Sequence, residues 1–313
     1  MPVSPSNNKK NGNTRKEVIL HPFEKIEACY KNIMQTPLKQ AEQIREADIV
    51  VGIPFYNEAD SVPRVVEIAK EGLNKYYPGF KCVIVAAGSP AGREALEAID
   101  ALPQDNKIER ITFLLDDERI NGKGWSVRAI AEIAQTLGAD QVILEADLKS
   151  RKNNGDIEGL APDWIYLLLE PIRTGQADMV VSKFNRHFLE APISTFTMYP
   201  LFTAIYNCPI HRLVGGQWGI SHHMLRNYLK DARRMWATDI SGYGIDIWIA
   251  ASAIVSGAKI CEANLGIKIH KPSIAKNELI LRQVASVLFA QIVADKEWWE
   301  ESHTIRELPL MQP

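Results

Sequence analysis

Two acidic residues flank a small one directly after an apolar stretch: Glu145-Ala146-Asp147 follows residues 141–144. One carboxylate can ligate magnesium or manganese, hard cations that prefer oxygen ligands and accompany diphosphates, while the other holds a ribose or a water. An acidic turn that only caps a sheet is the alternative, and the tripeptide alone favours it.

The segment Gly122-Lys123-Gly124-Trp125 precedes an amphipathic stretch and could hold a phosphate. Glycines let the backbone approach a ligand closely, and the lysine adds positive charge near a phosphate. The spacing excludes a Walker loop. No Gly-x-Gly-x-x-Gly follows a predicted strand, which argues against a dinucleotide-binding oxidoreductase. An exposed turn with a solvated lysine explains the segment equally well.

Two other segments combine aromatic and polar side chains. In Pro54-Phe-Tyr-Asn-Glu58 an aromatic ring could stack on a nucleobase while the amide and the acid bond its edge, although a helix N-terminus also explains the acid. In Gly215-Gly-Gln-Trp-Gly219, Gln217 could bond sugar hydroxyls and Trp218 could pack against a sugar face. A structural turn around a core tryptophan is the alternative for the second segment.

His270 ends the extended run of residues 264–270. Strand alternation places the aliphatic residues at 265, 267 and 269 on one face and His270 with Lys268 on the other. A solvent-exposed histidine is the usual meaning of such a position, so only its neighbours in the fold can give His270 a function.

Predicted strands alternate with predicted helices, which indicates an α/β fold with an open, mostly parallel twisted sheet flanked by helices. Ligands of such sheets bind beyond the carboxyl ends of the strands, so we expect the site at the loops 55–60, 88–93 and 145–150. Strands are expected at 48–54, 81–87, 111–115, 141–144 and 178–183, an extended segment at 259–270, and helices at 22–45 with a break at Pro37, 61–76, 126–137, 163–173, 195–206, 246–256 and 279–300.

Composition narrows the class of protein. The 313 residues carry a formal net charge of -2 with dispersed cations, which argues against a nucleic-acid partner. The apolar stretches 244–257 and 284–294 are too short to span a bilayer, so no transmembrane segment is expected. Residues 1–18 lack an apolar core and predict a disordered tail rather than a signal peptide. Four well-separated cysteines indicate reduced structural thiols and a cytoplasmic protein.

The five chemical segments, in this order, resemble the GT-A glycosyltransferases, and in particular the retaining glucosyl-3-phosphoglycerate synthase and mannosylglycerate synthase group. The resemblance covers roughly residues 48–292 of a single expected domain, 19–313, with a nucleotide-binding half at 47–150 and an acceptor-side half with the C-terminal helix at 151–313. Its more specific motifs are Val181-Ser-Lys-Phe-Asn-Arg186, Gly215-Gly-Gln-Trp-Gly219, Gly242-Tyr-Gly-Ile-Asp-Ile247 and Asn264-Leu-Gly-Ile-Lys-Ile-His270.

The resemblance implies a role for each matching residue. Asp147 and His270 look like the two ligands of a magnesium or manganese ion, and Lys123, Gln217 and Asp246 fall where the group contacts the reacting donor sugar or its diphosphate. The acceptor side is expected at Lys183, Asn185 and Arg186, and the donor pocket at Pro54, Phe55, Tyr56, Glu58, Gly88, Ser89, Lys123, Glu145, Gly216 and Gln217.

Several positions depart from the group. Ala86 stands where many related transferases carry an aspartate, so we expect one usual base contact to be absent. Glu145 replaces the commoner aspartate, and Gln217 stands where the phosphoglycerate enzymes usually carry glutamate. Residues 191–195 lack the Gly/Thr-rich loop that those enzymes use around phosphoglycerate, so the acceptor can differ.

The resemblance implies a homodimeric, retaining glycosyltransferase that moves a hexose from a nucleotide-diphosphate sugar, of the UDP-glucose or GDP-mannose type, to a small anionic acceptor such as glycerate or 3-phosphoglycerate. In this hypothesis the metal ion assists departure of the diphosphate. A sugar-1-phosphate nucleotidyltransferase is the first alternative, although residues 54–61 lack its Gly-rich, Arg-containing signature. A catalytically weak regulator that binds a nucleotide sugar is the second.

Overall fold

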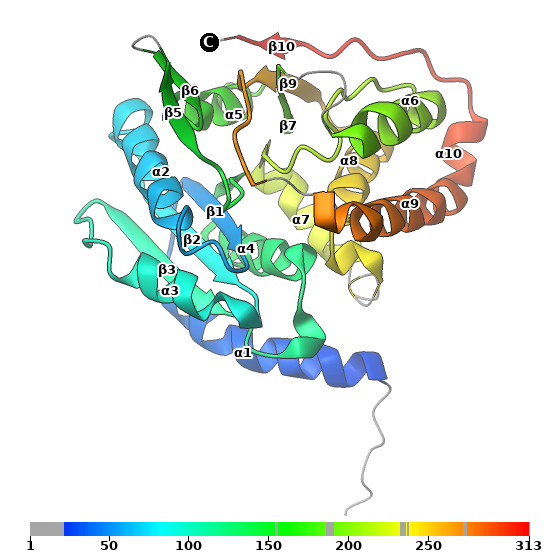
Figure 1. The fold of residues 1–313 in the computed structure, drawn as a ribbon. Helices are drawn as coiled ribbons and strands as arrows, with labels where there is room; N and C mark the ends of the chain where they lie inside the picture. The colour runs from blue at the N-terminus through cyan, green and yellow to red at the C-terminus, as the bar shows by residue number, and fades with distance from the viewer. Residues whose placement is uncertain are drawn as a thin grey trace, which may run out of the picture.

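An eight-stranded sheet organises the chain (Figure 1). The computed structural model describes residues 22–153, 156–185, 191–231, 236, 238–271 and 274–312. All neighbouring strands are parallel except β8, which runs antiparallel to both β4 and β7. The sheet order is β10 (Leu310–Met311), β9 (Ile260–Asn264), β7 (Met179–Lys183), β8 (Trp218–Ile220), β4 (Asp140–Ile143), β1 (Ile49–Phe55), β2 (Cys82–Gly88) and β3 (Ile108–Leu114).

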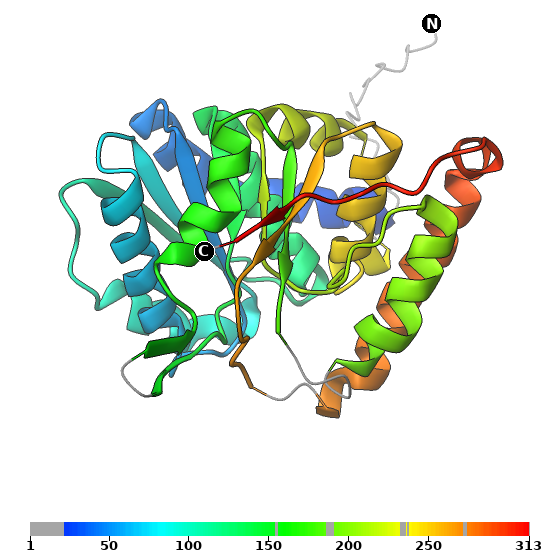
Figure 2. The ribbon, with the colours of Figure 1, turned by 90° about the horizontal axis from the view of Figure 1, so that it is seen from above.

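Helices cover both faces of the sheet, as the predicted α/β class requires (Figure 2). Side chains of β1 alternate between two cores: Val50 joins one, and Ile49 and Val51 join the other. Helices α2 (Val62–Tyr76), α3 (Arg93–Asp100) and α5 (Asp163–Arg173) contribute to the core of Ile49. The core of Val50 is built by α1 (Pro22–Ile44), α4 (Lys123–Leu137), α6 (Tyr199–Tyr206), α7 (His222–Asp231), α8 (Ile245–Val255) and α9 (Asn277–Ala294).

Most predicted elements are confirmed, and several differ. Helix α1 continues through Pro37 instead of breaking there. Strand β8 lies in the segment that was interpreted as a turn, at 215–219. Two additional strands, β5 (Ser150–Asn153) and β6 (Asp156–Gly159), pair with each other antiparallel outside the main sheet. The predicted end of α4 is confirmed, because Gly138 takes up the left-handed conformation with φ of 73°.

The C-terminal helices change one expectation. The helical stretch Ile274–Ala294 begins ten residues before the apolar run 284–294, and by length and composition it is long enough to cross a membrane. One such helix is weak evidence for a membrane span. The helix that ends at Ala294 is followed by a separate helix, α10 (Lys296–Glu300), although residues 279–300 were expected to form one helix. All four cysteines are free thiols, as predicted.

Candidate functional site

A cavity of about 1250 Å³ opens where the strands β1, β2 and β4 end, as the sheet topology predicts. The loops after these strands supply one wall of the cavity, and the second half of the chain supplies the other. The lining residues come from 54–58, 89, 121–126, 145–147, 151, 184, 191–194, 212–215, 241–246, 267–271 and 274–283. The predicted site loops at 55–60, 88–93 and 145–150 therefore each contribute to one cavity.

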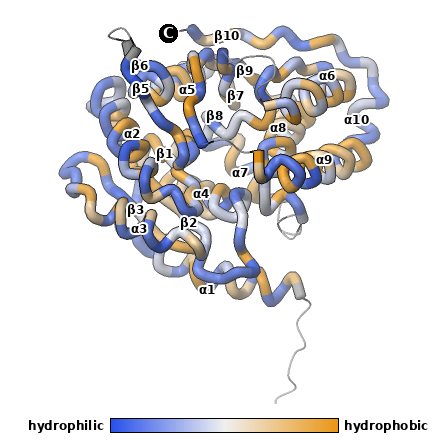
Figure 3. Tube along the Cα trace, viewed as in Figure 1, coloured by the Kyte–Doolittle hydropathy of each residue, from blue (hydrophilic) through white to orange (hydrophobic). Residues whose placement is uncertain are grey.

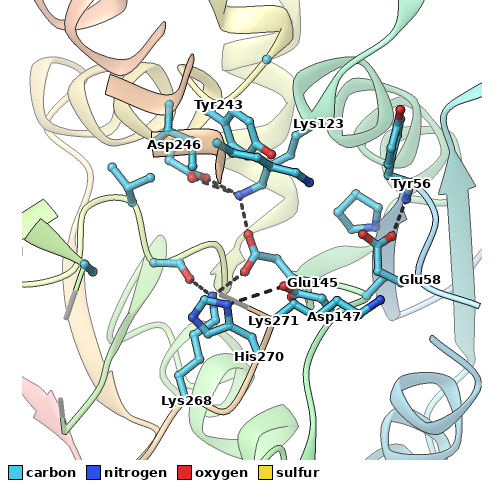
Figure 4. Close-up of a pocket in the computed structure, with 18 of the residues that line it drawn as sticks. Tyr56, Glu58, Lys123, Glu145, Asp147, Tyr243, Asp246, Lys268, His270 and Lys271 are labelled. Carbon is cyan, nitrogen blue, oxygen red and sulfur yellow. Dashed lines mark hydrogen bonds and ion pairs between the residues drawn. The ribbon is translucent and has the colours of Figure 1, made fainter. Parts of the chain in front are cut away.

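Lys123 connects two carboxylates at the centre of the cavity (Figure 4). Its Nζ lies 3.0 and 3.1 Å from the two oxygens of Asp246 and 3.1 Å from Oε1 of Glu145. Asp246 is the single charged residue of α8, and its side chain is 2% exposed. Removing a carboxylate from water is costly unless a cation compensates it, so the lysine is what allows an acid at this point of an apolar helix.

Glu145 is held from a second side by Lys268 and Gln217. The Lys268 ammonium donates to Oε2 of Glu145 and to the Gly215 carbonyl oxygen at 2.9 Å, and Gln217 Nε2 donates to Oε2 at 2.9 Å. Both oxygens of Glu145 are therefore occupied by protein donors. The sequence pattern placed Lys268 on the same face as His270 but gave it no role in the site.

The charges of this network set the protonation of its members. Burial opposes ionisation of Glu145, yet Lys268 and Lys123 hold the pKa of its carboxyl well below the usual range. Burial would lower the pKa of Lys123, but Asp246 and Glu145 together raise it. Burial raises the pKa of Asp246 against the opposing charge of Lys123. Near neutral pH the network therefore holds a charged lysine against an ionised Glu145.

Asp147 and His270 meet at the edge of the cavity, as the predicted metal site requires (Figure 4). Oδ2 of Asp147 lies 3.6 Å from Nδ1 of His270, and both side chains are about a quarter exposed or less. Asp147 follows β4, whereas His270 follows β9, so two distant segments converge here. The backbone bond from Lys149 N to Ile269 O, 2.8 Å long, joins the same two segments.

The glycines near the network have structural tasks. A Cβ on Gly216, whose φ is +84°, would stand 2.1 Å from Oε1 of Glu145. A Cβ on Gly124 would stand 2.0 Å from the Ile240 carbonyl oxygen. Gly124 packs against the backbone of Ile240 and Ser241, which explains the lack of a side chain there without a ligand, whereas Gly122 approaches the Ser241 carbonyl oxygen and also lines the cavity.

The first-strand loop supplies a distinct wall. Pro54, Phe55, Tyr56, Glu58 and Ser89 all line the cavity. The Phe55 ring is buried against Gly88, so Gly88 supports the wall without lining it. Tyr56 is 40% exposed, and it is therefore the ring of this loop that a nucleobase could reach.

The remaining predicted residues lie apart from the cavity wall. Gln217 and Gly216 contact Glu145 but do not themselves line the cavity. The buried Trp218 packs in the core, 5.1 Å from the Lys123 ammonium.

Two of the three predicted acceptor residues, Lys183 and Asn185, do not line the cavity. Lys183 forms an ion pair with the buried Glu262 at 3.4 Å, and neither Lys183 nor Asn185 is among the lining residues. Arg186 lies outside the described residues. Arg212, which no sequence motif singled out, is a cation that lines the cavity.

Neither a protein-family model nor a curated protein sequence matches the chain, whereas solved structures match over most of its length. The crystal structure of glucosyl-3-phosphoglycerate synthase from Mycobacterium tuberculosis with Mn²⁺, UDP and phosphoglyceric acid is similar, with a TM-score of 0.55, 17% identity and coverage of 81% of each chain. Its complex with Mn²⁺, UDP-glucose and glycerol 3-phosphate gives 0.53 and 16%, covering 81% of this chain and 82% of that chain.

These matches concern the fold, because so few residues are identical. They agree with the eight-stranded, mostly parallel sheet and with helices on both of its faces. The chain therefore has the GT-A fold of these synthase structures.

Proposed function

We propose that the chain is a metal-dependent, retaining glycosyltransferase that moves a hexose from a nucleotide-diphosphate sugar to a small anionic acceptor such as glycerate or 3-phosphoglycerate. The observation that carries the proposal is the approach of Asp147 and His270 to 3.6 Å at a cavity of donor-substrate size. The fold match and the sequence motifs support a donor of the UDP-glucose or GDP-mannose type. Retention of configuration rests on the resemblance alone.

The residues present fit a divalent ion. Two ligand atoms that each lie about 2.1 Å from one ion are separated by roughly 3–4 Å, which the Asp147–His270 pair matches. Among the described residues no group of three or more acidic, His or Cys side chains could enclose a metal. Magnesium and manganese sites of this kind use few protein ligands and take the rest from substrate phosphates and water. A bound ion would neutralise the charge of the diphosphate.

Protein side chains would do the positioning. Asp246 keeps lone pairs for donor-sugar hydroxyls after binding Lys123, and we assign it this orienting role rather than that of a base. Lys123 fixes Asp246 and Glu145 relative to each other, and Gln217 acts through Glu145. Tyr56 and Glu58 would contact the nucleotide. No protein nucleophile is assigned, and a phosphate oxygen of the donor could accept the acceptor's proton.

Removal of either metal ligand tests the proposal. For Asp147→Ala and His270→Ala we expect turnover to fall by at least about 100-fold, because even the partners that orient metal ligands are worth 10–100-fold. The stabilisation of the protein by UDP-glucose or GDP-mannose should also lose its dependence on Mn²⁺, as measured by thermal shift. Asp60→Ala is the control, because Asp60 pairs with Lys271 but does not line the cavity.

Product analysis separates the alternatives. Release of nucleoside diphosphate is expected, whereas pyrophosphate would identify a nucleotidyltransferase. Binding of a donor without any transfer or hydrolysis would indicate a regulator. Near-normal turnover of either alanine variant with an unchanged metal requirement would disprove the ligand assignment. We also propose that the protein works in the cytoplasm as a homodimer.

A further inference from the structure

The cavity holds several cations whose charges acidic residues already compensate. Lys123 binds Asp246 and Glu145, and Lys268 binds Glu145. At the rim, Lys271 binds Asp60 at 2.9 Å and Arg151 binds Glu158 at 2.6 Å. These cations therefore serve carboxylates of the protein itself.

Arg212 is a further cation that lines this cavity. Its Nη1 donates to Oγ1 of Thr195 at 2.7 Å, which directs the guanidinium toward the helical segment that begins at Ile193. Gly215 follows three residues later, and its carbonyl oxygen accepts from Lys268. The chain around Arg212 is packed closely here, since a Cβ on Gly215 would stand 2.7 Å from the Arg212 carbonyl oxygen. Only residues 213 and 214 therefore separate Arg212 from Gly215, whose carbonyl oxygen binds Lys268 of the network around Glu145.

Ser194 provides an independent sign of a ligand. The residue is 4% exposed, and it lines the same cavity as Arg212. Its Oγ has no hydrogen-bond partner among the described residues. Buried hydroxyls in folded proteins are nearly always bonded, so a hydroxyl kept here at the cavity wall calls for a partner from outside the protein. The hydroxyl lies directly before Thr195, which already binds Arg212.

We infer that Arg212 and Ser194 form the subsite that binds the oxyanion of the acceptor, a carboxylate or a phosphate, with Thr195 orienting the guanidinium of Arg212. A guanidinium with adjacent hydroxyls matches the oxygens of such groups, and charge-assisted hydrogen bonds are the stronger kind. That the anion is the acceptor of a transfer reaction rests on the proposed function. Arg212 takes the acceptor-binding role that was expected of Lys183, which pairs with Glu262. It also accounts for the missing Gly/Thr-rich loop, because residues of the following helix and of the loop at 212 take over anion binding.

Calorimetric titration of the full chain with 3-phosphoglycerate, D-glycerate and neutral glycerol, with and without UDP and Mn²⁺, tests the subsite. For Arg212→Gln we expect the Kd of both anions to rise by about 10- to 100-fold, the range of a lost charge-assisted contact. Glycerol and UDP binding should not change. Arg212→Lys should restore part of the affinity. Ser194→Ala should weaken anion binding several-fold without lowering the melting temperature, since its hydroxyl satisfies no protein group among the described residues.

The controls make every outcome decisive. Arg226→Gln removes an exposed cation of α7 that does not line the cavity, and it should bind both anions like the wild type. Unchanged anion binding by Arg212→Gln would overturn the subsite, and so would a wild type that binds neither anion. Failure of the proposed function would look different: no nucleotide sugar would bind with Mn²⁺, while the Arg212-dependent binding of 3-phosphoglycerate would persist.

Discussion

Glu145 accepts hydrogen bonds from Lys123, Lys268 and Gln217, so both of its oxygens face protein donors. A carboxylate held in this way is a poor candidate for a metal ligand. Asp147, two residues later, points to His270 instead. The two acids therefore have separate partners: Glu145 belongs to an internal ion network, and Asp147 pairs with His270.

Gly216→Ala tests whether the position of Glu145 matters for turnover. The new Cβ would stand 2.1 Å from Oε1 of Glu145, and the displaced carboxylate would release Lys123 and Lys268. We expect kcat to fall by about 100-fold, since a displacement of about 1 Å in a site can cost that much. Steady-state kinetics measure the fall in kcat, and urea unfolding measures the change in the free energy of unfolding.

Gly257→Ala is the matched control for that experiment. Gly257 also has a positive φ, of 76°, but no described atom lies within 4 Å of the point where its Cβ would stand. Both variants should lose about 1–2 kcal/mol of unfolding free energy from the left-handed backbone, and only the one at 216 should lose activity. Equal kinetics in the two variants would show that the glycine serves the backbone alone.

Sequence could identify the site residues that carry motifs, but not all their neighbours. Lys123, Asp147, Asp246 and His270 do line one cavity, because each follows or begins a regular element. Lys268 was missed as a partner of Glu145, since β9 ends at Asn264 and Gly266 then turns with φ of 69°. Alternation along a strand does not extend past such a turn.

The acceptor side was harder to predict for a different reason. Lys183 lies in a good strand, and its partner Glu262 comes from the neighbouring parallel strand, a pairing that no local pattern reveals. Arg212 lies in a loop without periodicity. A single sequence can therefore show that a cation exists, but not which wall it faces.

At the scale of elements, the buried parallel strands were the most predictable feature. Strands β1 and β2 are buried along their whole length, as their continuous apolar runs predict. Strand β8 escaped prediction because it has three residues and follows two glycines, yet it lies between β4 and β7. Its place in the sheet is decided by neighbours far away in sequence.

Helix α1 was predicted to break at Pro37, and it does not. A proline inside a helix costs about 3 kcal/mol through a lost hydrogen bond and a clash, so packing must compensate. Tyr30, Met34 and Ala41 of α1 are fully or almost fully buried. Arg128 of α4 adds an anchor, with two hydrogen bonds of 2.7 Å to Glu27 and its guanidinium 4.1 Å from the centre of the Tyr30 ring.

Arg128→Met tests this anchor. The Arg128 side chain is 5% exposed, and its loss would leave Glu132 without this cation and Glu27 with only the exposed Lys31 at 4.0 Å. We expect the free energy of unfolding to fall by about 3 kcal/mol, as for other buried ion pairs with one partner removed. Hydrogen exchange should rise in α1 before other helices. Arg64→Met, which also separates an arginine from two glutamates but at half-exposed positions, should cost less than about 1 kcal/mol.

At the scale of the molecule, two helical segments present apolar faces to the outside. Residues 191–206 contain no charged residue, and α6 and α9 are coloured largely as hydrophobic (Figure 3). The segment Ile193–Met198 that precedes α6 packs against α9. The exposed side chains of these segments include Phe196, Leu201, Phe289 and Val293, with Phe289 and Val293 59% and 77% exposed. Exposed apolar side chains that gather on one face are typical of a surface that contacts another molecule.

The proposed homodimer would cover that surface with the same surface of a second copy, since two-fold contacts are self-complementary. Light scattering should therefore give twice the 35.1 kDa of one chain without added lipid or detergent. Phe289→Glu with Val293→Glu would bury four carboxylates in such an interface, and we expect a folded monomer because both side chains are exposed in the single chain. Ile305→Glu, a change of a 69% exposed aliphatic outside these helices, should leave the dimer intact. A wild-type protein that is already monomeric, or a double variant with the mass of a dimer, would mean that this face serves another partner.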